Sequence, residues 1–110
     1  MHHEDTELYK QMLQLVAESA QAIRRIPRGN AFLVDQLKRA SMSVPLLFCE
    51  GARRRSAGDR AHYFDMSAGS ARECRSIADV AHSGNVMSAE DRAVIKDRCD
   101  HICAMLYKFR

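Results

Sequence analysis

The chain has 110 residues, and its 17 Lys and Arg against 14 Asp and Glu give a formal net charge of +3. This length corresponds to a single domain, residues 1–110, which can bury a core without disulfides or a metal. No stretch approaches the roughly 18 apolar residues of a membrane span, and the polar N-terminus MHHEDTELYK is unlike a signal peptide. We therefore expect a cytoplasmic protein with no membrane partner.

The composition favours an all-α fold. There are only 5 Gly and 2 Pro, Trp is absent, and the good helix formers Ala, Leu, Arg, Glu and Gln are frequent. The cysteines form no CxxC pair and lie in helical patterns, which favours buried reduced thiols over disulfides or a zinc site; they are Cys49, Cys74, Cys99 and Cys103. We expect no cofactor and no metal.

The first helix is predicted at residues 7–26, because apolar residues recur there on one helical face and Pro27 ends the pattern. Its C-terminal end is rich in cations, namely Arg24, Arg25 and Arg28. Cations at this end stabilise the helix dipole, and they could equally contact a ligand. Both interpretations stay open.

The second helix, predicted at residues 31–55, carries the most regular apolar seam, with steps of four and three between Leu33, Leu37, Ala40, Val44, Leu47 and Gly51. Pro45 should kink this helix rather than end it, because the apolar pattern resumes in register. After Pro45, successive apolar residues point in four directions, more than one small bundle can cover. We therefore expect a homo-oligomer with an interface at Leu46, Phe48 and Cys49.

Two capping boxes of the form Ser-x-x-Asp, at residues 56–59 and 88–91, predict that the last two helices occupy residues 57–83 and 89–109. The loops between all four predicted helices are short. Short loops make consecutive helices antiparallel neighbours. The sequence therefore predicts an up-down-up-down antiparallel four-helix bundle.

Arg75 is a single charged residue on the small-residue seam of the third helix, and we expect it to form a buried ion pair with a carboxylate such as Glu50 or Glu73. His62 and Asp65 could join this pair across two helices, which would permit hydrolysis or metal binding. The sequence has no glycine-rich phosphate loop and no zinc-ligand spacing. We therefore expect no enzyme activity, and a hydrolase that depends on Glu50 or His62 is a third hypothesis.

Several motifs together resemble a known family: RIP at residues 25–27, VDQLKRASMSVP at 34–45, CEGARRRS at 49–56, AGSARE at 68–73 and MLY at 105–107. Across almost its whole length the chain resembles the four-helix bundle proteins encoded in intervening sequences of 23S ribosomal RNA. The accessory variability determinant proteins of diversity-generating retroelements are similar to the same family. Where the family usually has Ser-Asn-Ile-Ala before Glu-Gly, this chain has the more apolar segment Leu46-Leu47-Phe48-Cys49.

The resemblance implies a closed homopentamer. For the retroelement relatives it also implies a basic surface that binds nucleic acid and a reverse transcriptase. Independently of the resemblance, the predicted topology gathers cations at one end of the bundle, namely Arg53, Arg54, Arg55, Arg60, Lys108 and Arg110. A solvated cap partly neutralised by N-terminal acids is the other interpretation of this cluster.

We predict a non-enzymatic homo-oligomer that binds the phosphates of RNA or DNA through this arginine-rich surface. The alternative is a scaffold that binds a protein partner, for example a reverse transcriptase, without contacting nucleic acid. The steep salt dependence of phosphate contacts would separate the two functions.

Overall fold

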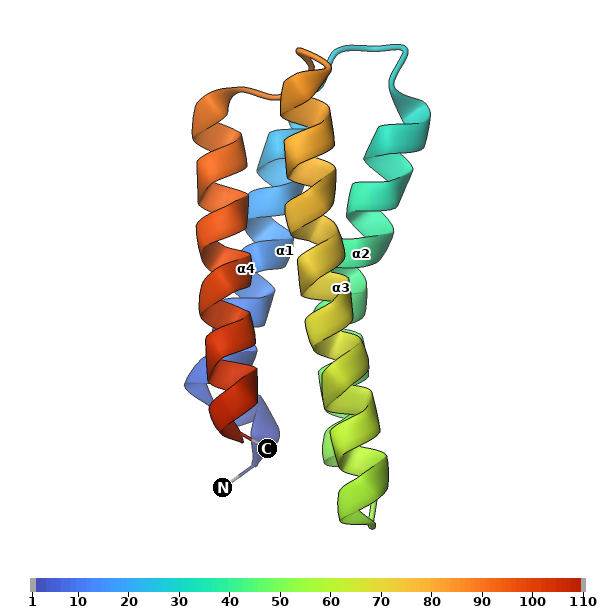
Figure 1. Ribbon diagram of the computed structural model, residues 1–110, viewed down its shortest axis with the longest axis vertical. Helices are drawn as coiled ribbons and strands as arrows, with labels where there is room; N and C mark the ends of the chain where they lie inside the picture. The colour runs from blue at the N-terminus through green and yellow to red at the C-terminus, as the bar shows by residue number, and fades with distance from the viewer. Residues whose placement is uncertain (1, 110) are drawn as a thin grey trace.

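The computed structural model describes residues 2–109, which are helical apart from short turns (Figure 1). A short 3₁₀ helix, η1 (His3–Asp5), precedes α1 (Glu7–Arg24), α2 (Ala31–Ala52), α3 (Ala57–Ser83) and α4 (Ala89–Phe109). No strand occurs among these residues, so the predicted all-α class is confirmed. Across the same range, no helix combines the length and the apolar character needed to cross a membrane.

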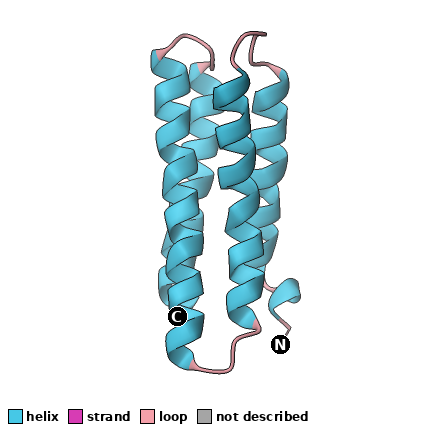
Figure 2. Ribbon diagram, turned by 90° about the vertical axis from the view of Figure 1, so that its right-hand side faces the viewer, coloured by secondary structure: helices cyan, strands magenta, loops and turns pink. Residues whose placement is uncertain are grey.

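The four long helices run up, down, up and down, as Figures 1 and 2 show. Each helix packs against two others, and the contact of α1 with α4 closes the ring. The hairpin of α2 and α3 extends past the ends of α1 and α4, at the end of the bundle where the two termini lie. We call residues 52–61, which form the projecting turn and its flanks, the hairpin tip.

Side-chain caps fix the starts of three helices. Ser56 Oγ accepts a hydrogen bond from Asp59 N at 3.1 Å, and Ser88 Oγ accepts one from Asp91 N at 3.0 Å, as the capping boxes predict. Thr6 Oγ1 caps α1 in the same way by accepting from the third residue that follows it. Each cap of this kind contributes about 0.5–2 kcal/mol of stability.

Helices α1 and α2 end earlier than predicted, at Arg24 and Ala52 instead of residues 26 and 55. At the end of α2, the N–H groups of Arg53 and Arg54 donate to carbonyls three residues back, at 3.3 and 3.0 Å, which tightens the last turn. Ser56 is extended (φ −87°, ψ 147°) because it caps α3. Residues 53–55 therefore belong to the turn between the two helices.

The core is apolar and runs the length of the bundle. Helix α3 contributes small buried residues, Ala71, Cys74 and Ala78, which allow its neighbours to approach closely. The other helices supply most of the large buried side chains, namely Met12, Leu15, Leu37, Val44, Phe48, Ile95, Ile102 and Leu106. Burying each large side chain contributes about 1.5–3 kcal/mol relative to leaving it exposed.

Three aromatic rings close the core at the end near the termini. The centroid of the Phe48 ring lies 5.4 Å from that of Phe64 and 5.3 Å from that of Phe109, and Phe48 is 0% exposed. The prediction that Phe48 faces a partner subunit is therefore wrong. Its own bundle covers it, because α3 and the end of α4 bring aromatic rings to the side of α2 from which Phe48 projects.

Pro45 lies inside α2, and the helix continues past it, as predicted. A proline has no N–H, so the helix loses one internal hydrogen bond at this point. Next to the proline, Ser67 Oγ on α3 donates to the carbonyl oxygen of Val44 at 2.7 Å. This buried bond ties α2 to α3 where the hydrogen-bond ladder of α2 is interrupted.

Ion pairs join α1 and the residue that follows it to α4. Arg98 donates to both carboxylate oxygens of Glu18 at 3.0 Å, and it also contacts the side-chain oxygen of Gln11. Arg25 donates to the two oxygens of Asp91 at 2.9 and 2.7 Å, and these hydrogen bonds lower the pKa of the Asp91 carboxyl. Two ion pairs, at different heights along the bundle, thus join α1 and its C-terminal end to α4.

Candidate nucleic-acid interface

The hairpin tip carries four of the arginines that the sequence assigns to a phosphate-binding surface. Arg53, Arg54 and Arg55 occupy the turn, and Arg60 lies in the first turns of α3. Helix α4 ends on the same side of the molecule and brings Lys108 to this end (Figure 1). Arg110 lies outside the described residues. Among the described residues, the four arginines of the tip differ in what they contact.

Arg54 is held by its own protein. Its Nη2 donates to Glu50 Oε1 at 2.6 Å and to Tyr63 Oη at 2.9 Å. The guanidinium carbon also lies 4.7 Å from the centroid of the Tyr63 ring, within the range of a cation–π contact. Because these contacts fasten the end of α2 to α3, we assign Arg54 a structural role.

Arg60 is likewise engaged with the backbone. Its Nη1 donates to the carbonyl oxygens of Arg54 and Arg55, at 3.0 and 2.8 Å. These carbonyls follow the C-terminal end of α2, where backbone oxygens have no partner within the helix. Arg60 therefore stabilises the turn, and only its other guanidinium nitrogens can donate to a ligand.

Arg53 and Arg55 are the cations of the tip that remain available. The Arg53 side chain is 66% exposed, and its nearest carboxylate oxygen, Oε2 of Glu50, lies 4.0 Å away. Arg55 is exposed, and within residues 2–109 its guanidinium forms no ion pair and no hydrogen bond. An exposed guanidinium without a partner can form forked hydrogen bonds with a phosphate.

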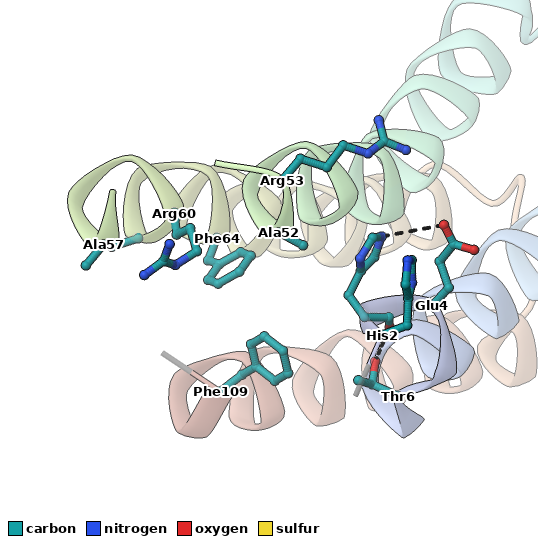
Figure 3. Close-up of a pocket in the computed structure, with 11 residues that line it drawn as sticks. His2, Glu4, Thr6, Ala52, Arg53, Ala57, Arg60, Phe64 and Phe109 are labelled. Carbon is teal, nitrogen blue, oxygen red and sulfur yellow. Dashed lines mark hydrogen bonds and ion pairs between the residues drawn. The ribbon is translucent and has the colours of Figure 1, made fainter. Parts of the chain in front are cut away.

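A cleft of about 1110 Å³ lies beside the tip, between η1, the α2–α3 hairpin and the end of α4 (Figure 3). Arg53 and Arg60 line one side, and Glu4 lines another. Phe64 and Phe109 point toward each other in it, with ring centroids 5.5 Å apart. The cleft combines an apolar surface with charges of both signs, because Glu4 lines it together with the two arginines.

Leu46 and Cys49, the other two residues assigned to an oligomer interface, are placed differently from Phe48. Leu46 is 68% exposed on the outer face of α2, so a partner could cover it. Cys49 is half-buried, and burial raises the pKa of its thiol. Leu46 is therefore the stronger candidate for an interface.

The predicted buried ion pair between Glu50 and Arg75 does not form. Glu50 contacts Arg54 and Arg53, and Arg75 Nε donates to Asp100 Oδ1 on α4 at 2.7 Å. Both pairs are substantially exposed. The correction has a simple geometric reason: Arg75 projects toward α4, whereas Glu50 lies near the hairpin tip.

His62, another residue of the hydrolase hypothesis, is exposed and packs its ring edge against Tyr63, with centroids 5.9 Å apart. Arg75 is bound to Asp100 instead of Glu50. Glu50 and Arg75 therefore do not form the pair that the hydrolase hypothesis includes. This arrangement gives no support to the hydrolase hypothesis.

Comparison with protein-family models identifies a match over nearly the whole chain. The model of the 23S rRNA-intervening sequence protein family matches residues 4–108. The chain belongs to this family. Comparison with curated proteins gives no match.

A solved structure has the same fold as this intervening-sequence family member. It is the crystal structure of a protein of unknown function from the S23 ribosomal protein family of Bacteroides thetaiotaomicron. The TM-score is 0.84, and the alignment covers 93% of this chain and 96% of that one at 12% sequence identity. At this low identity the likeness establishes the shared fold alone.

Sequence analysis missed part of the exposed apolar surface of this family member. Phe32 is 78% exposed, and Met42 is also exposed on α2. With Leu46 they share one face of the helix, because at 3.6 residues per turn positions 32, 42 and 46 fall within about 80° of one another around the helix axis. That spacing was present in the sequence, but the stronger seam through Leu37 and Val44 masked it.

Proposed function

We propose that this protein is a non-enzymatic, nucleic-acid-associated homo-oligomer that binds RNA or DNA phosphates at the hairpin tip. The observation that carries the proposal is the difference between the four arginines of the tip. Arg54 and Arg60 hold the turn, which leaves Arg53 and Arg55 exposed and without strong partners on a rigid support. Because the backbone of this turn is already held in place, phosphate binding would have to order only the two side chains and not the turn as well.

The family supports RNA as the nucleic acid. It is named for proteins of 23S rRNA intervening sequences, so its members are associated with ribosomal RNA by origin. We infer that the protein acts in the cytoplasm, where ribosomal RNA is found. Its net charge of +3 agrees with a polyanionic partner but is too small to identify one.

Self-association would increase the effect of the two arginines. The exposed stripe of Phe32, Met42 and Leu46 on α2 supports an interface between copies of the chain. We propose the closed homopentamer that the family resemblance implies. A ring repeats the same pair of arginines around its axis, which raises affinity for a long polyanion through multivalency.

The test is a comparison of two double variants by fluorescence anisotropy with a labelled RNA and a labelled duplex DNA over a range of salt concentrations. Replacing Arg53 and Arg55 by Ala should weaken binding for all sequences alike. The slope of log affinity against log salt should fall by up to about 0.7 per lost contact on single strands and about 0.9 on duplex DNA. The matched control replaces Arg24 and Arg28, which are exposed at the opposite end.

An unchanged salt slope in the Arg53 and Arg55 variant, with assembly intact, would overturn the proposal. The protein scaffold would then be the better hypothesis, with a reverse transcriptase as the partner that the resemblance to retroelement proteins suggests. The exposed apolar residues of α2 are the feature that favours this second function. Binding to such a partner should depend on Leu46 and should change little with salt.

A further inference from the structure

The N-terminal segment brings three potential metal ligands together beside the cleft. The ligand atoms of His2, His3 and Glu4 all lie within 4.8 Å of one another. The rings of His2 and His3 stack with centroids 4.9 Å apart. Two imidazoles and a carboxylate are a ligand set that Zn²⁺ and related divalent ions prefer.

His3 has a polar atom that the protein leaves unsatisfied. Its side chain is 13% exposed, and Nε2 is buried without a hydrogen-bond partner. The nearest acidic oxygen, Glu4 Oε1, is 3.8 Å away, which is too far for a hydrogen bond. A buried nitrogen without a partner is costly unless something binds it. A metal ion held between His3 and Glu4 would satisfy it.

The backbone of the segment is fixed while two of the three ligands can move. Thr6 Oγ1 donates to the carbonyl oxygen of His3 at 2.7 Å, and Thr6 also caps α1. The His3 ring packs edge-on against Phe48 and Tyr9, with centroids 6.0 and 6.4 Å away. His2 and Glu4 are exposed, so their side chains can rotate to close the distance of up to 4.8 Å around an ion.

We propose that His2, His3 and Glu4 bind one divalent transition-metal ion of the Zn²⁺ type at the mouth of the cleft, with water completing a tetrahedral shell. The sequence predicts no metal, because it has no CxxC pair and no zinc-ligand spacing. In a regular helix, adjacent histidines would also point in different directions. The local backbone differs: His2 is extended (φ −71°, ψ 138°) and His3 begins η1. Arg53 lines the same cleft and opposes the ion electrostatically, and the charge of Glu4 offsets this repulsion.

The ion would fasten η1 over the aromatic end of the core. It would join His3, which contacts Phe48 and Tyr9, to the exposed side chains of His2 and Glu4. A ligand that binds only the folded chain raises its melting temperature, and the shift grows with the logarithm of the free ligand concentration once this exceeds Kd. This site does not depend on nucleic-acid binding, so the two proposals can fail separately.

The test uses the untagged full chain, free of metal, titrated with Co²⁺ and then with Zn²⁺. Co²⁺ should bind with one ion per chain and give visible absorption bands without the intense near-ultraviolet bands of thiolate ligands, and Zn²⁺ should displace it. His3→Ala and Glu4→Gln should each lower the affinity at least about tenfold. Glu4→Gln alters an exposed side chain only, so it tests the site even if His3→Ala affects folding. His62→Ala is the matched control and should bind like the wild type.

Zn²⁺ should also raise the melting temperature of the wild type and of His62→Ala more than that of Glu4→Gln. The proposal is overturned if the wild type binds no Co²⁺ at millimolar concentration. It is also overturned if Glu4→Gln binds as tightly as the wild type, or if the spectrum shows thiolate ligands.

Discussion

Gly51 on α2 lies against Tyr63 on α3 so closely that a Cβ atom added to Gly51 would be 2.7 Å from the Cβ of Tyr63. The added atom would also lie 2.9 Å from the Phe64 ring. Both neighbours are atoms of buried or half-buried side chains on a helix that cannot easily move. The glycine therefore sets how closely the two helices of the hairpin can approach.

Replacing Gly51 by Ala should destabilise the fold by about 1–3 kcal/mol, because the extra methyl group must displace α3 or its aromatic rings. Gly69 on α3 is the control, since nothing lies within 4 Å of a Cβ added there. Gly69→Ala should stabilise the helix by about 0.5–1 kcal/mol. Urea denaturation of both variants checks the prediction. The two changes in the free energy of unfolding need not be equal in size. A Gly51→Ala variant as stable as the wild type would contradict the close approach of the two helices.

Removing Arg98 should be more damaging than removing an arginine from a surface pair. Glu18, its partner, has a side chain that is only 14% exposed, so Arg98→Ala leaves a carboxylate poorly solvated and unpaired. We expect a loss of about 1–3 kcal/mol in the free energy of unfolding. Arg39→Ala breaks an exposed pair with Asp35 and should cost less than about 1 kcal/mol. Similar losses in both variants would show that the Arg98 contact is weak in solution.

Stability at low pH should depend on the Arg25–Asp91 pair. Hydrogen bonds from Arg25 hold the pKa of Asp91 below its usual value in the folded protein. The pair therefore stabilises the fold above the unfolded pKa of about 3.9, and this contribution is lost as the pH falls through the lower folded pKa. Asp91→Asn should flatten the acid side of a plot of stability against pH. Asp97→Asn, which alters an exposed acid of the same helix, should leave the profile unchanged.

The cysteines should react slowly with thiol reagents in the folded state. Cys74 and Cys99 are buried, and the hydrogen-bonding contact with Cys74 together with burial raises the pKa of the Cys99 thiol. Burial also raises the pKa of Cys103. Because the thiolate is the reactive form, raised pKa values lower the rate at neutral pH. Labelling kinetics with and without denaturant test this, and rapid native labelling of Cys99 would contradict the buried position.

Leu46→Arg should abolish self-association, because it places a charge in the exposed apolar stripe of α2. Light scattering at micromolar concentration measures the effect. Leu13→Arg, an equivalent change at an exposed leucine of α1, should leave the assembly intact. If the wild type is already a monomer under these conditions, the apolar stripe serves another purpose.

The bundle could be predicted because its signals are local and agree with one another. The seam through Leu37 and Val44 has a helical period, and Ser56 and Ser88 mark helix starts by their own hydrogen bonds. The end of α2 was harder to predict. The sequence of residues 53–55 is compatible with a helix. They lie outside α2 because Ser56 must be extended to cap α3.

The site was less predictable than the fold because long side chains choose partners in three dimensions. The sequence cannot tell that Arg54 and Arg60 hold the turn whereas Arg53 and Arg55 do not. The partners of Phe48, an apolar residue, could not be predicted from the sequence either. After Pro45 every direction around α2 carries an apolar residue, so the side that faces the core depends on where α3 and the end of α4 place their aromatic rings.

Because the α2–α3 hairpin projects beyond α1 and α4, its end should unfold locally more often than the rest of the bundle. Backbone amides of the two projecting ends have neighbours on fewer sides than those of the four-helix section, so they should exchange with solvent deuterium sooner. The bonds that Arg54 and Arg60 make across the turn are what slow this local unwinding. If a molecule binds the hairpin tip, amide exchange should become slower in these last turns only. Exchange in the middle of the bundle should not change.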